Sequence, residues 1–320
     1  MQRDIAGPSF FEGMLLGNGD VGACVVVRQD ALGIHIGKND CWDIRVSEDS
    51  AEAILPFSDL LDLWRRAGEE AKEQGKPDMI FLERHIDFFH EYNKKAINSY
   101  SQKWPRPWPC GTIWLNWDLR QIRILQYRLD PSNGLFTLDL ESFTPEGQSR
   151  TVQLTAIVDR ATGVISVVTD KPLELFSVVY SPEVDKGNVF GISASENDVI
   201  PGSAAQAAER LPAPDTKVDI KDSYATLSCF QHFPATAPTD KKPSSLHPDK
   251  DRNFSLFAKT MGKWSIGTAD VGSDLSILPA GAMPILPASA VSLKPAGAQV
   301  LRLDVFIATP RDVLLSKLEK

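Results

Sequence analysis

Six segments between residues 112 and 180 alternate apolar and polar side chains, with short turns between them. Successive side chains of a β-strand point to opposite faces, so this alternation predicts strands with one buried face. The turns contain the residues that reverse a chain most readily, as in Asp130–Gly134 and Arg160–Gly163. Short strands at regular spacing are typical of an antiparallel sandwich. The sequence therefore predicts strands at 112–117, 120–129, 134–140, 150–158, 163–169 and 173–180.

The same β pattern resumes after a Pro-, Ala- and Ser-rich segment, residues 181–217, which we expect to form a loop. Further strands are predicted at 223–230, 254–260, 263–267 and 300–308. Trp114 and Trp117 lie three positions apart in one predicted strand, so they point to opposite faces and one of them belongs to the core. The predicted fold class is mainly β, a large antiparallel β-sandwich.

Residues 57–100 differ from this pattern because their apolar side chains recur at helical spacing. The segment from Phe57 to Trp64 begins one predicted helix, and Asp78 can cap a second. We expect these helices to form an insertion in the sandwich. A short C-terminal helix is predicted over 309–320, with Thr309 as its N-cap.

Composition narrows the classes of partner. The chain has 320 residues, 42% of them hydrophobic, which is enough for a large core. Its net charge of −8 argues against nucleic acid and anionic membranes, which attract clustered Lys and Arg. The sequence shows no apolar run as long as a transmembrane helix, and residues 1–8 lack the apolar stretch of a signal peptide. We expect no nucleic-acid or membrane partner and favour a cytoplasmic location.

The cysteines and histidines do not follow the spacing of metal ligands. No C-x-x-C or H-E-x-x-H pattern occurs, so the sequence predicts neither a metal nor a cofactor. We expect Cys24, Cys41, Cys110 and Cys229 to be free and mostly buried thiols. The alternative for two of them is a Cys24–Cys41 disulfide across the first hairpin.

The first hairpin, residues 14–46, contains the most distinctive motifs. A tight turn reads Gly17-Asn18-Gly19-Asp20-Val21-Gly22-Ala23, and the returning strand ends in the loop Asn39-Asp40-Cys41-Trp42. This hairpin resembles the start of the family 95 glycoside hydrolases and their relatives among the six-hairpin glycosidases. Those enzymes open with a Gly-Asn-Gly-x-x-Gly-Ala turn, a strand, and an Asn-Glu/Asp-x-x-Trp loop.

The resemblance implies that residues 1–308 form the N-terminal β-sandwich, or supersandwich, of such a protein. Residues 309–320 would begin the linker helix to an (α/α) barrel that this chain appears too short to contain. In these enzymes the general acid and base are carboxylates on that barrel, so the resemblance implies no catalytic residue here. The helical segment at 57–100 and the Trp/Pro segment near residue 104 depart from the family pattern.

Six residues are candidates for carbohydrate contact, because sugars stack on aromatic rings while planar polar groups bond their hydroxyls. Each also has a structural explanation. The polar loops can be ordinary turns, the loop tryptophan can be buried, and the two tryptophans among prolines can pack in a core or interface instead of forming an exposed platform. The candidates are Asn18, Asn39, Asp40, Trp42, Trp104 and Trp108.

Three hypotheses for function remain open at this point. The first is a non-catalytic N-terminal domain that supports a helical barrel and contributes loops to a carbohydrate site. The second is a stand-alone carbohydrate-binding or scaffolding protein of the same fold, whereas self-association through an exposed docking face would favour the first. The third is an enzyme of another kind, with His85 or His90 as a base.

Overall fold

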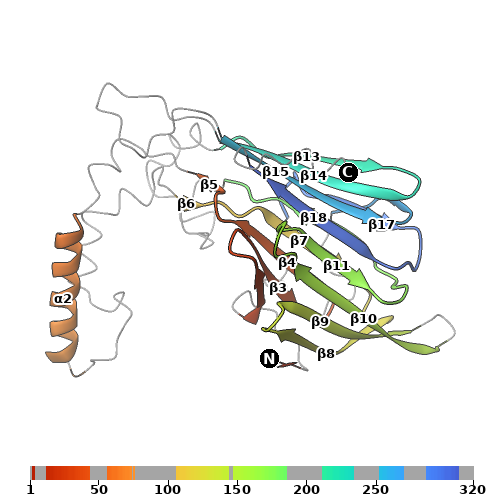
Figure 1. Ribbon diagram of the computed structural model, residues 1–320, viewed down its shortest axis with the longest axis horizontal. Helices are drawn as coiled ribbons and strands as arrows, with labels where there is room; N and C mark the ends of the chain where they lie inside the picture. Colours follow the sequence, from red (N-terminus) through yellow and green to blue (C-terminus); the bar gives the residue numbers. More distant parts are fainter. Residues whose placement is uncertain are drawn as a thin grey trace.

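The computed structural model describes residues 2–3, 12–43, 56–73, 75, 106–143, 147–185, 211–233, 252–269 and 286–309. Two large antiparallel sheets contain more than half of these residues (Figure 1). The mainly β fold predicted from the sequence is therefore confirmed.

The larger sheet contains nine strands in the described part of the chain, in the order β1-β8-β9-β10-β11-β18-β15-β14-β13. Each strand is antiparallel to its neighbour, and the pairs β8–β9, β9–β10, β10–β11 and β13–β14 are adjacent along the chain. The bounds are β1 (Gln2–Arg3), β8 (Ile122–Asp130), β9 (Leu135–Phe143), β10 (Ser149–Val158), β11 (Ile165–Thr169), β13 (Asp215–Ile220), β14 (Tyr224–Phe233), β15 (Arg252–Met261) and β18 (Arg302–Ala308).

The second sheet has seven strands within the described residues, in the order β16-β17-β12-β7-β4-β3-β2. Strands β5 and β6 form a separate two-stranded ribbon, in which β5 follows β4 along the chain and β6 precedes β7. The bounds are β2 (Met14–Gly17), β3 (Val21–Val27), β4 (Ala31–Lys38), β5 (Trp42–Asp43), β6 (Arg106–Pro107), β7 (Gly111–Asn116), β12 (Ser177–Ser181), β16 (Trp264–Ile266) and β17 (Val291–Pro295).

One hydrophobic core lies between the two sheets. It joins Val25 and Ile34 of the smaller sheet to Leu138, Leu154 and other buried residues of the larger sheet. Burial alternates along β10 and β14, as expected for strands that turn one face to a core. This is the layered arrangement of a β-sandwich.

The smaller sheet is also covered on its outer face. There, Trp114, Ala31 and Val179 form a second buried cluster, against which Ala269 and Leu286 pack. Trp117 belongs to the main core on the other face. The predicted opposite orientation of the two tryptophans is confirmed, and both are buried.

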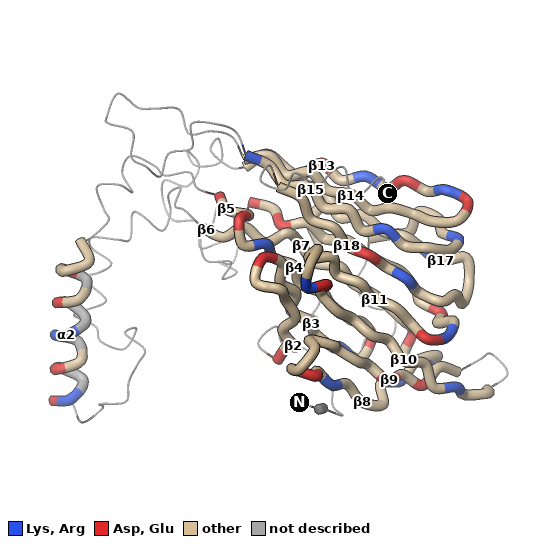
Figure 2. Tube along the Cα trace, in the orientation of Figure 1, with Lys and Arg blue, Asp and Glu red and all other residues tan. Residues whose placement is uncertain are grey.

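Helix α2 (Phe57–Glu73) confirms the first predicted helix and lies to one side of the sheets in Figure 1. Acidic and basic residues alternate along it (Figure 2). Residues 76–100, with the second predicted helix, His85 and His90, lie outside the described residues, as do residues 310–320. The helical insertion beyond α2 and the C-terminal helix therefore stay predictions.

Candidate functional site

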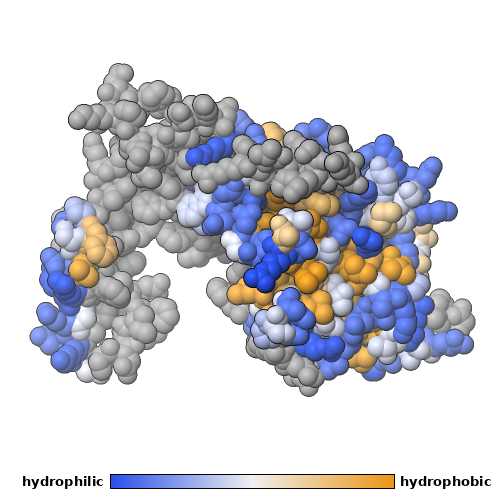
Figure 3. All heavy atoms as spheres, viewed as in Figure 1, coloured by the Kyte–Doolittle hydropathy of each residue, from blue (hydrophilic) through white to orange (hydrophobic). Residues whose placement is uncertain are grey.

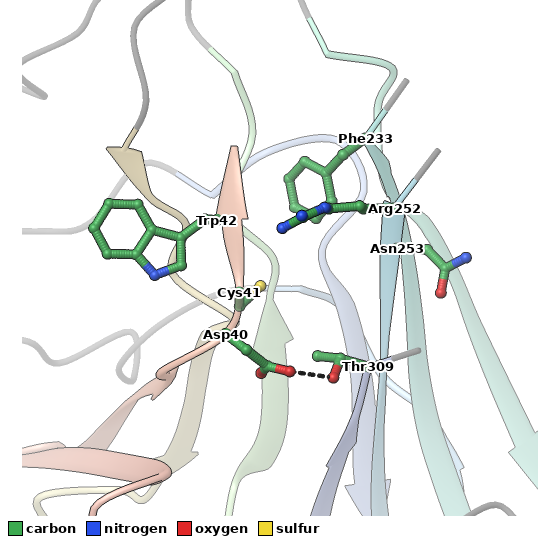
Figure 4. Close-up of a pocket in the computed structure, with 7 residues that line it drawn as sticks. All are labelled: Asp40, Cys41, Trp42, Phe233, Arg252, Asn253 and Thr309. Atoms are coloured by element: carbon green, nitrogen blue, oxygen red, sulfur yellow. Dashed lines mark hydrogen bonds between the residues drawn. The ribbon is translucent and has the colours of Figure 1, made fainter. Parts of the chain in front are cut away.

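A small pocket opens at the end of the sandwich where strands of both sheets terminate. Its volume is about 120 Å³. It lies between the loop after β4, the ribbon strand β5, the paired ends of β14 and β15, and the residue that follows β18 (Figure 4). The lining residues are Asp40, Cys41, Trp42, Phe233, Arg252, Asn253 and Thr309.

Strand register brings the distant parts of this pocket together. Phe233 and Arg252 are direct cross-strand partners at the last pair of β14 and β15. Strand β18 lies on the other side of β15, with Ala308 opposite Ser255, so Thr309 emerges beside the same end. Residues separated by about 200 positions from Asp40 therefore meet it at the pocket.

A buried lysine fixes the loop that carries Asp40. The Lys38 side chain is 2% exposed, and its Nζ lies 2.6 Å from Asp20 Oδ2 and 3.3 Å from Asp40 Oδ1. The Lys38–Asp40 contact is an ion pair without hydrogen-bond geometry, since Asp40 Oδ1 is buried and receives no hydrogen bond. Thr309 Oγ1 donates to the other carboxylate oxygen at 2.5 Å. Asp40 thus connects the smaller sheet to the end of β18.

Trp42 is held in place with its ring accessible. Its Nε1 donates to the carbonyl oxygen of Asn39 at 2.8 Å, and 38% of the residue is exposed. The Asn39 side chain is also exposed. In Figure 4 the Trp42 indole lies on one side of β5, whereas the guanidinium of Arg252 lies on the other. The loop therefore presents two adjacent surfaces, an aromatic ring and a polar pocket.

The position of Arg252 follows from the alternation of inward and outward side chains along β15. Phe254, Leu256 and Ala258 on this strand are buried in the core, and Arg252 shares their face. Its side chain consequently points into the space between the sheets at the end of the core, as Figure 4 shows. Asn253 belongs to the opposite face of the strand, and its amide points away from the guanidinium (Figure 4).

Behind the pocket the structure is apolar and contains three thiols. The hydrogen bond with Cys41 and burial raise the pKa of Cys110, and burial raises the pKa of Cys229 to about 11. Burial also raises the pKa of Tyr180, whose hydroxyl donates to the Cys110 carbonyl at 2.8 Å. Cys110, Cys229 and Tyr180 therefore stay protonated and neutral near pH 7. All four cysteines are free and buried, as predicted, so the alternative Cys24–Cys41 disulfide is not formed.

The six residues predicted to contact carbohydrate do not lie together in the structure. Asp40 and Trp42 line the pocket, and Asn39, which directly precedes Asp40, lies at the surface. Asn18 is engaged in its turn, because its Oδ1 accepts from the backbone N–H groups of Asp20 and Val21 at 3.0 and 2.8 Å. Its amide nitrogen lies 3.4 Å from the Arg160 carbonyl oxygen. Trp104 lies outside the described residues.

For Trp108 the expectation of an exposed aromatic platform is corrected. The residue is 3% exposed and packs edge to face against Phe233, with ring centroids 5.9 Å apart. Apolar burial outweighs the turn-like composition of the surrounding Trp/Pro segment. Trp108 therefore supports the pocket wall from behind and cannot stack on a sugar.

Sequence reasoning missed five residues of the pocket, which are Cys41, Phe233, Arg252, Asn253 and Thr309. The sequence did contain one signal for Arg252. It lies two residues before Phe254, so it belongs to the same face of β15 as the apolar residues. A charged residue at such an inward position marks the end of a core or a site. The sequence does not indicate which loop would lie opposite.

The described lining of this pocket combines a carboxylate, a guanidinium, an amide, a hydroxyl and a thiol with two aromatic rings. Asp40 is the only carboxylate among the lining residues, whereas glycoside hydrolysis uses a pair of carboxyl groups about 5–9.5 Å apart. Within the described ranges, His, Cys, Asp and Glu form no group of three or more placed to hold a metal ion. None of the helices in the described part is long and apolar enough to cross a membrane.

Comparison with known proteins adds no assignment. No protein-family model matches the sequence, and no curated protein matches it.

Proposed function

We propose that this chain is a carbohydrate-binding β-sandwich, equivalent to the non-catalytic N-terminal domain of a six-hairpin glycosidase-like protein. The observation that carries the proposal is the exposed ring of Trp42 beside the pocket that contains Asp40 and Arg252. An accessible aromatic face next to planar polar groups is what a saccharide requires. The hairpin motifs that resemble family 95 enzymes support the same proposal, because they supply both Asp40 and Trp42.

The geometry favours an oligosaccharide over one sugar. The indole of Trp42 and the guanidinium of Arg252 lie on opposite sides of β5 (Figure 4), so we expect different sugar residues to contact them. A pocket of about 120 Å³ is also smaller than the ~300–1,000 Å³ typical of drug-sized ligands. It can admit one part of a chain while the next unit stacks on Trp42.

A glycan array followed by calorimetric titration of each hit tests this function. We expect Trp42→Ala to weaken binding about tenfold or more, since aromatic anchors contribute upwards of about 1 kcal/mol at binding sites. Phe176 is a matched control because it is 37% exposed, compared with 38% for Trp42. Its backbone nitrogen bonds the carbonyl of Asn116, at the other end of β7 from the pocket. Equal losses in both variants, or no binding to any glycan, would contradict the proposal.

An exposed apolar face on the larger sheet supports the proposed docking of a helical barrel. Apolar side chains gather on the face of the molecule over which β10, β11 and β18 run (Figure 3). Phe257 and Phe306 are direct cross-strand partners on the outer side of the larger sheet, and Phe230 nearby is 42% exposed. Exposed apolar surface of this kind is typical of docking faces.

Sedimentation velocity at several protein concentrations tests this face. If it docks against another body, the isolated chain should self-associate, and Phe230→Lys should reduce that association. Leu15, 72% exposed on β2 of the other sheet, is the matched control position for a Lys substitution. A chain that stays monomeric at all concentrations argues against docking and favours the stand-alone carbohydrate-binding protein. In either case we expect no hydrolysis of aryl glycosides by the purified chain.

A further inference from the structure

Arg252 is a charged residue of the pocket whose charge no residue described by the structure balances. Its guanidinium points into the space between the sheets and is partly buried. The structure shows no ion pair or hydrogen bond from its side chain to any residue that it describes. A partly desolvated cation without a partner is unfavourable, so such a group is more often the receptor for a ligand than a stabilising element.

The acid in the same pocket does not serve as that partner. Asp40 receives the Thr309 hydroxyl on one oxygen and faces Lys38 on the other. Lys38 and Thr309 are themselves buried, so these contacts are a fixed part of the fold. Asp40 is thereby held in its own network, in which Lys38 also pairs with Asp20, and no residue in the described part of the chain forms an ion pair with the guanidinium of Arg252.

We propose that the pocket recognises an anionic group carried by a sugar, with Arg252 as the residue that binds it. The guanidinium presents donors in a planar fork that matches a carboxylate or a sulfate. A uronic acid or a sulfated sugar would place this group in the pocket, and the neighbouring unit of the chain would stack on Trp42. This inference rests on the proposed carbohydrate-binding function and specifies its substrate class.

Matched pairs of sugars that differ only at carbon 6 provide the test. Glucuronate with glucose, galacturonate with galactose, and mannuronate with mannose keep the ring and its stereochemistry while changing a carboxylate to a hydroxymethyl group. Dissociation constants of the full chain are measured by ligand-observed NMR titration at low salt. Glucose 6-sulfate and galactose 6-sulfate separate a sulfated ligand from a uronate.

We expect the acidic member of at least one pair to bind about tenfold or more tightly than its neutral partner, as charge-assisted bonds to arginine do. Arg252→Gln should remove this preference, so that the acidic member of the pair binds no more tightly than its neutral partner. Arg252→Lys should give an intermediate affinity, because it keeps the charge and loses the fork. Arg302→Gln, which removes an exposed arginine paired with Asp304, should leave all affinities unchanged.

The outcomes separate the inference from the function on which it rests. If a neutral sugar binds as tightly as its acidic partner, or if Arg252→Gln leaves the preference intact, the inference is wrong and carbohydrate binding stands. If neither these sugars nor any glycan of the array binds, both are wrong. A folded Arg252→Gln variant, checked by circular dichroism, is required for each comparison.

Discussion

Substituting Gly111 by alanine should strongly destabilise the chain, because both its backbone conformation and its close packing exclude a Cβ. Gly111 begins β7 directly after Cys110 and has φ of 100°, a conformation that residues with a Cβ rarely adopt. A Cβ placed there would lie 2.7 Å from the Ser181 carbonyl oxygen and 2.8 Å from the Tyr180 ring. Tyr180 cannot easily retreat, because it is fully buried and its hydroxyl bonds the Cys110 carbonyl.

The magnitude can be built from two contributions. The backbone conformation alone costs about 1–3 kcal/mol for a non-glycine residue. Forcing an extra methyl group into a filled core costs about another 1–3 kcal/mol. The lower entropy of the unfolded alanine chain returns about 0.4–1 kcal/mol. We therefore expect Gly111→Ala to lower the free energy of unfolding by about 1–5.5 kcal/mol.

Two control variants divide this loss into its parts. Gly19 has φ of 94° but no atom within 4 Å of its hypothetical Cβ, so Gly19→Ala reports the backbone contribution alone. Gly37 has no neighbour within 4 Å and lies outside the positive-φ region, so Gly37→Ala should change stability by less than about 0.5 kcal/mol. Urea denaturation followed by circular dichroism and tryptophan fluorescence measures all three. If Gly111→Ala costs no more than Gly19→Ala, the close packing of Tyr180 against this glycine is not a constraint.

Three further predictions follow from the fold. Burial raises the pKa of Cys229 from its usual 9.0 to about 11. Between pH 9 and pH 11 the folded thiol therefore stays protonated while the unfolded thiol ionises. The free energy of unfolding should consequently fall by up to about 3 kcal/mol as the pH rises through this range. Urea titrations across this range should show a smaller loss for Cys229→Ala, and equal losses would contradict the assignment. Asn18→Ala should cost about 1–2 kcal/mol by the same method, since two backbone N–H groups lose their acceptor; no change would mean that the turn does not depend on this side chain. Trp108→Ala should cost about 3–5 kcal/mol, and a loss below about 1 kcal/mol would place the ring at the surface.

Much of the β architecture was predictable because strand formation leaves a local trace. The alternation from residue 112 to residue 180 reappears as β7 to β12, with bounds close to those predicted. The segment 173–180 is partly different, because Leu173 forms an isolated bridge with Gln299 and β12 begins only at Ser177. Strand β13 (Asp215–Ile220) starts within the segment expected to be a loop, and only Val218 and Ile220 of its half-buried face are apolar and pack against the core.

Strand β17 was not predicted either. Its five residues end in Pro295 and follow a region rich in proline and alanine, which favours loops in isolation. Pairing with β12 and β16 on both sides supplies the stabilisation that the local sequence lacks. Tertiary context therefore overrides propensity at this position.

The sequence by itself determined the mainly β class, the first helix, the free buried thiols and the loop that carries Asp40 and Trp42. These features depend on periodicity, composition and short motifs, which are properties of neighbouring residues. Only the tertiary structure decided that Arg252 and Thr309 meet that loop and that Trp108 lies behind it. The physical reason is that sheet order and cross-strand register place residues about 200 positions apart side by side, and local spacing does not encode either.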